Sequence, residues 1–105
     1  MSANTYQELS LRTWDKTKPG ALRRLYLAAA LNEEAGEVAG IIKKNVYHGK
    51  PLDVDALRDE LGDVMWHVAI IASEFGIDLE AVMAANIAKL EKRHPTGDTS
   101  AFYAR

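Results

Sequence analysis

The chain has 105 residues, of which 48% are hydrophobic and 27% charged, and this composition predicts one soluble domain spanning residues 1–105. A formal net charge of -2 gives no broad basic surface for nucleic acid and no polybasic signal for a membrane, so we expect neither as a partner. The absence of cysteine excludes disulfides and thiolate metal sites, so any metal needs oxygen or imidazole ligands. No apolar run is long enough to cross a bilayer, and we expect a cytoplasmic protein.

Helical periodicity runs through almost the whole chain, and no stretch alternates as a strand would, so we expect an all-α fold. Thr5 and Glu8 have the spacing of a capping box, which predicts a first helix through about residue 14. The second helix is expected at residues 21–46 and the third at residues 54–75, where Gly76 ends it.

The remaining part of the chain predicts one more helix and a tail. Asp78 is placed to cap the fourth helix, and Pro95 ends it. Residues 96–105 then form a C-terminal tail. The short "YHGKPLD" segment between the second and third helices predicts that they form an antiparallel hairpin.

Two acidic pairs stand at helical spacing on the two long helices. Glu34 and Glu37 are three residues apart on the second helix, as are Glu60 and Asp63 on the third, so each pair points to one side of its helix. The midpoint between the pairs falls in the hairpin turn, which brings both pairs to the same level. The sequence therefore predicts that four carboxylates face one another.

Such a cluster is unfavourable without a compensating charge, because neighbouring carboxylates repel and cannot all stay ionised. A hard divalent cation is the simplest source of that charge, and oxygen-only ligands suit Mg²⁺ or Mn²⁺. Because Mg²⁺ commonly binds substrate phosphates as well, the cluster predicts a phosphate-bearing substrate. Glu33 lies off the face of Glu34, and its role stays open between a second-metal ligand, a base that orients water and a surface charge.

Two glycines accompany the acidic pairs. Gly36 and Gly62 each precede the last acid of a pair in mid-helix, where glycine costs roughly 0.5–1 kcal/mol relative to alanine. The matched positions predict that either the two helix backbones or a ligand approaches closely there.

The fourth helix offers groups that complement an acidic metal site. Asn86, Lys89 and Arg93 form one stripe, and their amide, ammonium and guanidinium groups suit the oxygens of a phosphate. Trp14 and Trp66, with Tyr26, are candidates for stacking on a base, although aromatic residues on amphipathic helices more often lie in a core or an interface.

At these residues the sequence resembles a known family. The segments "EEAGE" and "DELGDV" fit the pattern E-E-x-x-E, a spacer and E-x-x-D, and closely resemble the MazG-type all-α nucleoside triphosphate pyrophosphohydrolases. The segments "TYQELSLRT" and "ANIAKLEKRHPTG" resemble the beginning and end of the short single-domain members.

The resemblance implies hydrolysis of a nucleoside triphosphate or deoxynucleoside triphosphate to the monophosphate and pyrophosphate, as in nucleotide-pool housekeeping. It implies a four-helix bundle assembled as a homodimer or homotetramer, and a water oriented or deprotonated by Glu33 or Glu37. Mg²⁺ would be held by Glu34, Glu37, Glu60 and Asp63. Independently, "LYLAAAL" and "VMWHVAIIA" are apolar nearly all round, which favours association between copies.

Two other functions remain open at this stage. One is a phosphoribosyl-ATP pyrophosphohydrolase, a class of enzyme that shares the broad fold and the clustered acidic residues with the MazG-type enzymes. The other is a non-catalytic helical module that binds nucleotide or a protein partner.

Overall fold

The computed structural model describes residues 1–100, which contain four helices and no strand. These helices are α1 (Ala3–Leu11), α2 (Gly20–Val46), α3 (Val54–Glu74) and α4 (Leu79–Arg93). The all-α prediction is confirmed. Of the predicted tail, residues 101–105 lie outside the described part of the chain.

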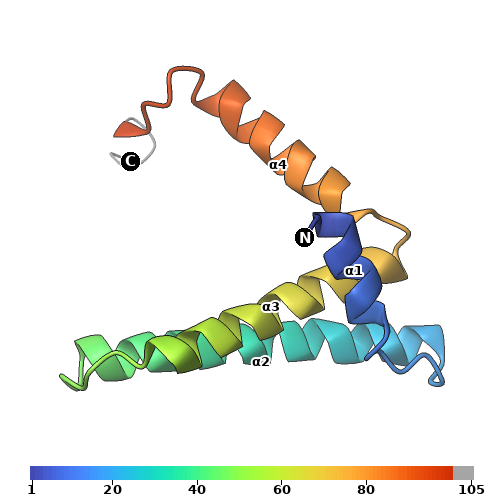
Figure 1. Ribbon diagram of the computed structural model, residues 1–105, viewed down its shortest axis with the longest axis horizontal. Coiled ribbons are helices and arrows are strands. Elements are labelled where there is room, and N and C mark those ends of the chain that lie inside the picture. The colour runs from blue at the N-terminus through green and yellow to red at the C-terminus, as the bar shows by residue number, and fades with distance from the viewer. Residues whose placement is uncertain (101–105) are drawn as a thin grey trace.

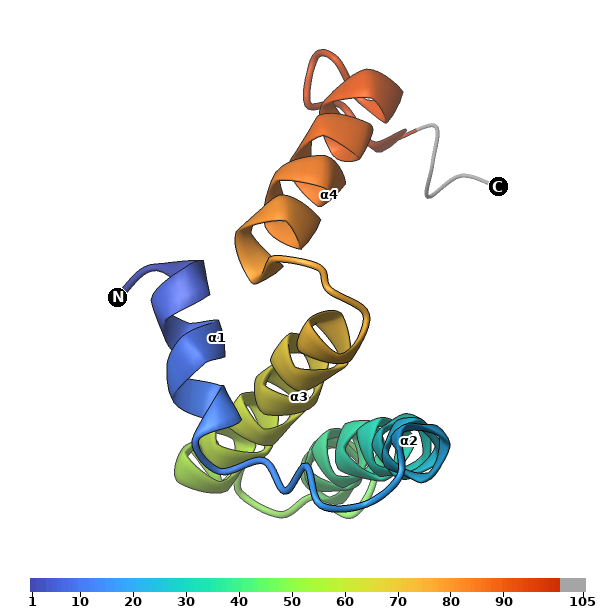
Figure 2. The ribbon, with the colours of Figure 1, turned by 90° about the vertical axis from the view of Figure 1, so that its right-hand side faces the viewer.

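The two long helices form the body of the molecule. Figure 1 shows α2 and α3 running side by side in opposite directions, as the predicted hairpin requires. In Figure 2, α1 lies against α3, and α4 extends away from the hairpin. Within the described residues α4 contacts α1 and α3 but not α2, so the expected four-helix bundle does not close within one chain.

The first helix starts earlier than predicted, and the predicted capping box is wrong. The cap is Ser2, whose side-chain oxygen accepts the Thr5 backbone N–H at 3.1 Å. Thr5 therefore lies inside the first turn, and its backbone N–H is the group that Ser2 caps. The helix also ends at Leu11, short of Trp14.

Gly76 ends α3 as predicted. Its φ of +69° lies in the left-handed region that glycine adopts without steric cost. The N–H of Gly76 donates to the Ser73 carbonyl at 3.1 Å, and the N–H of Ile77 donates to the Ala72 carbonyl at 2.8 Å. These two bonds define a Schellman motif, which turns the chain sharply towards α4.

Side chains of α1 cap the start of α4. Asp78 occupies the predicted cap position, but its side chain makes no capping hydrogen bond. Instead, Gln7 Oε1 accepts the Leu79 N–H at 2.8 Å, and Asn4 Oδ1 accepts the Glu80 N–H at 3.2 Å. The buried Gln7 amide also donates to the end of α3 and the following turn, at Ala69 O, Ser73 Oγ and Ile77 O. This joint holds α1, α3 and α4 together.

The core of the single chain is small. Leu27 and Ile70 are the largest fully buried side chains, at 1% and 0% exposed, among the described residues. The radius of gyration is 16.8 Å, whereas a compact domain of about 100 residues has roughly 13 Å. Many apolar side chains that the periodicity places on one helix face stay exposed, including Leu22, Leu25, Ile42, Leu61, Val68 and Phe75. No helix among the described residues has the length and apolarity to span a membrane.

Candidate functional site

Three of the predicted acids meet between the two long helices. Glu34 of α2 and Glu60 and Asp63 of α3 each place a carboxylate oxygen within 4.8 Å of the other two. Glu34 and Glu60 are half-buried and Asp63 is exposed. Glu37 is exposed and lies outside this group of three, although its negative charge acts on Glu60. The hairpin thus brings both acidic pairs to one level of the fold.

The cluster disfavours its own negative charge. A hydrogen bond with Glu34 is the main cause that raises the pKa of Glu60, and partial loss of water contact adds to the rise. The negative charges of Glu34, Asp63 and Glu37 raise the pKa further. Each of these interactions favours a protonated carboxyl at Glu60, so a cation at this position would relieve the repulsion.

The donor set fits a hard cation held by oxygen alone. Two oxygens bound to Mg²⁺ at about 2.0–2.1 Å lie at most about 4.2 Å apart across an octahedron. The three carboxylate oxygens lie within 4.8 Å of one another, so small side-chain rotations would bring them to this spacing. Carboxylates and water are also the ligands that Mg²⁺ and Mn²⁺ prefer.

The other residues named beside the cluster have different surroundings. Glu33 is exposed and is not one of the three acids that meet. At Gly36 and Gly62 an added Cβ would meet no atom of another helix within 4 Å. The explanation of these glycines by close approach of the two backbones is therefore wrong within one chain. Close approach of a ligand stays a prediction.

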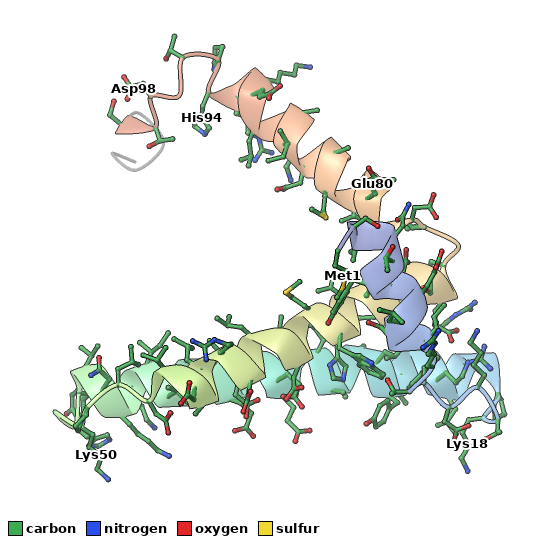
Figure 3. All side chains as sticks on the ribbon, viewed as in Figure 1. Met1, Lys18, Lys50, Glu80, His94 and Asp98 are labelled. Carbon is green, nitrogen blue, oxygen red and sulfur yellow. The ribbon has the colours of Figure 1, made fainter. Side chains whose placement is uncertain are left out.

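The aromatic candidates gather in one pocket. Trp14 stacks on Tyr26 with ring centroids 6.0 Å apart, and it meets Trp66 edge-on at 5.8 Å. The three rings line a cavity of about 520 Å³ together with Thr13, Asp15, Lys18, Leu22 and Arg23. Figure 3 labels Lys18 at the end of the hairpin opposite the turn that carries Lys50, and the pocket lies at the Lys18 end.

The pocket is next to the acidic cluster. Trp66 follows Asp63 by three residues on α3, so the two side chains lie on one side of that helix. His67, one residue further, is buried, and its Nδ1 lies 2.7 Å from the Asp63 carbonyl oxygen, so it is a satisfied structural histidine. On α2, Tyr26 precedes Glu34 by eight residues, or about 12 Å along the helix. The pocket and the cluster thus form two adjoining parts of one surface.

The predicted phosphate-binding stripe lies elsewhere in the single chain. Asn86, Lys89 and Arg93 are all exposed on α4, which makes no contact with α2. The same helix exposes an apolar set between 38% and 55%, made up of Val82, Met83, Ile87 and Leu90. Within one chain, therefore, the fold does not bring this stripe against Glu34.

An ion pair that no sequence motif predicts lies behind the aromatic pocket. Arg23 Nε donates to Glu74 Oε1 at 3.0 Å, and Arg23 Nη2 donates to Glu74 Oε2 at 3.2 Å. Trp14 Nε1 donates to the same Glu74 Oε1 at 2.9 Å. No local motif signals this arrangement, because Glu74 is 51 positions from Arg23 and 60 from Trp14.

Fold and site together define a class of protein, an all-α hairpin whose long helices gather carboxylates beside an aromatic pocket. The family model described as the MazG nucleotide pyrophosphohydrolase domain matches residues 23–97, and the chain belongs to this family. The predicted resemblance is thereby confirmed. The matched range includes the acidic cluster and the stripe on α4 but not Trp14.

Two curated proteins are similar to the chain. The Gene 37 protein of Mycobacterium phage L5 is 37% identical over 76 residues, which cover 69% of this chain and 67% of the relative. The uncharacterized protein YvdC of Bacillus subtilis (strain 168) is 36% identical over 72 residues, which cover 60% of this chain and 68% of the relative. No solved structure matches the chain.

Proposed function

We propose that the protein hydrolyses nucleoside triphosphates or deoxynucleoside triphosphates to the monophosphate and pyrophosphate, as nucleotide-pool housekeeping. The observation that carries this proposal is the meeting of Glu34, Glu60 and Asp63 between the two long helices of a chain in this family. The raised pKa of Glu60 supports a cation at the cluster, because the acids repel one another without one.

The acids have two tasks in this proposal. Glu34, Glu37, Glu60 and Asp63 would hold Mg²⁺, or Mn²⁺ in its place, and the bound ion would supply positive charge to the phosphate oxygens. Glu37 or Glu33 orients a water and takes its proton as the water oxygen attacks the α-phosphorus. The bond between the α-phosphorus and the bridging oxygen breaks, and pyrophosphate leaves.

The aromatic pocket supplies a place for the base. Trp14 and Trp66 would bind a base by stacking, which is worth about 1–3 kcal/mol per base in proteins that bind single-stranded nucleic acid. A cavity of about 520 Å³ is of the size that small-molecule sites have. Since Tyr26 lies about 12 Å along α2 from Glu34, a base in the pocket would direct its triphosphate towards the acids.

The phosphate-binding stripe would come from a second copy of the chain. In one chain α4 exposes its apolar side chains and stays away from α2, and the hairpin also leaves apolar side chains uncovered. Packing α4 of one copy against the hairpin of another would bury both surfaces. It would also bring Asn86, Lys89 and Arg93 to the phosphates beside the acids. The assembly is then a homodimer, or a homotetramer of two such pairs.

The activity is tested by pyrophosphate release from all common NTPs and dNTPs, with phosphoribosyl-ATP as a further substrate. We expect Mg²⁺-dependent pyrophosphate from at least one NTP or dNTP, and its loss in Glu37→Gln and Asp63→Asn proteins that remain folded. Asp59→Asn is a matched control, since Asp59 is exposed on α3 and lies outside the cluster. Turnover of phosphoribosyl-ATP alone would replace the proposal by that activity. Binding without turnover would support a non-catalytic module.

The role of the second copy is tested by mixing two inactive variants. Glu60→Gln removes an acid and Lys89→Ala removes a cation of the stripe. In a dimer with reciprocal sites, refolding the two variants together restores about one quarter of the sites, because half of the dimers are mixed and each has one intact site. If a single chain supplied both groups, the mixture would stay inactive.

A further inference from the structure

A buried carboxylate lies behind the aromatic pocket and outside the acidic cluster. The side chain of Glu74, at the end of α3, is only 6% exposed, and it does not line the pocket. Both of its oxygens accept hydrogen bonds from Arg23, and Oε1 also accepts the indole N–H of Trp14. Because Arg23 and Trp14 both line the pocket, Glu74 holds two parts of the pocket wall from behind.

The same network fastens the segment between α1 and α2. Besides its bonds to Glu74, Arg23 Nη1 donates to the backbone carbonyls of Lys18 at 2.7 Å and Lys16 at 3.3 Å. This segment contains no helix, so side chains must hold it in place. Arg23, followed by Trp14, lowers the pKa of Glu74 by hydrogen bonding, so the carboxylate stays ionised at neutral pH. The ion pair therefore connects α3, the start of α2 and the connecting segment.

The orientation of the Trp14 ring depends on this network. The indole N–H has its partner at Glu74, and one face of the ring lies against Tyr26. Trp66 is oriented separately, since its indole N–H donates to Thr13 Oγ1 at 2.9 Å. The indole N–H groups of both tryptophans thus have hydrogen-bond partners, which set the orientation of the two rings in the pocket wall. A wall held in place before the ligand arrives saves the entropy of ordering it on binding.

We propose that Glu74 is a positioning residue for recognition of the nucleotide base, acting through Trp14 and Arg23 to keep the aromatic pocket formed. This inference rests on the proposed function, in which that pocket receives the base. Glu74 accepts its side-chain hydrogen bonds from Arg23 and Trp14 and is not one of the clustered acids, so the proposed role is in binding and not in the chemical step.

The role predicts a change in KM with little change in kcat. With dATP and dCTP as substrates, Glu74→Ala is expected to raise KM about tenfold and to leave kcat within about twofold. Glu74→Gln keeps an oxygen for the Trp14 N–H but loses the charge that pairs with Arg23, so its KM rises less. Asp55→Asn is the control, because it breaks the exposed ion pair with Arg58 on the same helix.

A second measurement avoids phosphate chemistry. Deoxyadenosine and deoxycytidine should quench the tryptophan fluorescence of the wild type, and about tenfold more nucleoside should be needed for Glu74→Ala. Inhibition by inorganic tripolyphosphate, which has no base, should be the same for both proteins. Circular dichroism checks that each variant is folded, and if Glu74→Ala is not, the smaller shift of Glu74→Gln decides.

The two proposals fail in different ways. If the wild type hydrolyses no nucleotide but its nucleoside quenching still weakens in the Glu74 variants, the proposed function falls and the positioning role stands. If the wild type shows no quenching, or a folded variant binds nucleosides as the wild type does, the positioning role is overturned. An equal loss of affinity for tripolyphosphate would also overturn it, since that result indicates a general structural effect.

Discussion

Replacing Glu60 by glutamine separates two effects of the acidic cluster on stability. One is the repulsion between the acids, and the other is the binding of Mg²⁺. The substitution keeps the size of the side chain and removes a carboxylate whose protonated form is favoured by Glu34, Asp63 and Glu37. Without divalent cations, the variant is therefore expected to unfold at the same temperature as the wild type or at a higher one. A stabilising effect from the loss of a charged residue would show that the acids repel one another in the folded state.

With Mg²⁺ present, the order of stability reverses. A ligand that binds only the folded state at ten times its dissociation constant stabilises it by about 1.4 kcal/mol. For a domain of about 100 residues, each kcal/mol raises the melting temperature by roughly 4–8 °C, so the wild type should gain roughly 6–11 °C. The Glu60→Gln variant loses one of the three oxygens that meet within 4.8 Å, and it should gain much less.

Differential scanning calorimetry with and without MgCl₂ measures both effects. Asp59→Asn is the control, because it removes a neighbouring charge on α3 that lies outside the cluster. The control should gain the same temperature from Mg²⁺ as the wild type. An equal Mg²⁺-induced gain in Glu60→Gln would refute the assignment of the metal to this cluster.

Three further predictions concern the fold that supports the site. Gln7→Glu keeps the acceptor for the Leu79 N–H but has no N–H to donate to the carbonyl oxygens of Ala69 and Ile77. The free energy of unfolding in urea should therefore fall by about 1–3 kcal/mol, and amide exchange at Leu79 should become faster. Leu27→Ala should cost about 2–5 kcal/mol in the same assay, because Leu27 is 1% exposed, and a cost below 1 kcal/mol would contradict this packing. The pKa of Glu74 is lowered from its ordinary value of 4.5, so its stabilising effect is present above that pH and is lost as the pH falls below it. Acid titrations followed by circular dichroism should show a shallower loss of stability below pH 4.5 in Glu74→Gln than in the wild type.

The acidic site was accessible from sequence because local rules determine it. A helix places residues three apart on one side, and a short turn makes neighbouring helices antiparallel. These two rules bring Glu34 to Glu60 and Asp63 without knowledge of any distant contact. The end of α3 was predicted for the same reason, since Gly76 alone supplies the left-handed conformation.

Features that depend on distant partners were not predicted. The cap of α4 joins residues 72 and 76 positions apart, and the Arg23–Glu74 pair joins residues 51 positions apart. No local sequence pattern marks a glutamine that caps a distant helix or a glutamate that pairs with a distant arginine, because the packing of the helices determines the partner. Periodicity also marks which helix face is apolar without saying whether its own chain or another copy covers it. For this reason Leu61 and Phe75 follow the predicted stripe and are nevertheless exposed.

The capping of α4 by α1 has a consequence for the order in which the molecule assembles. The first backbone N–H groups of α4 donate to the side chains of Asn4 and Gln7, which lie near the opposite end of the chain. Closing so long a loop is entropically costly, so α4 should become protected after α1 has docked on α3. Shortening the N-terminus through Gln7 would then loosen the C-terminal helix first and leave the hairpin in place.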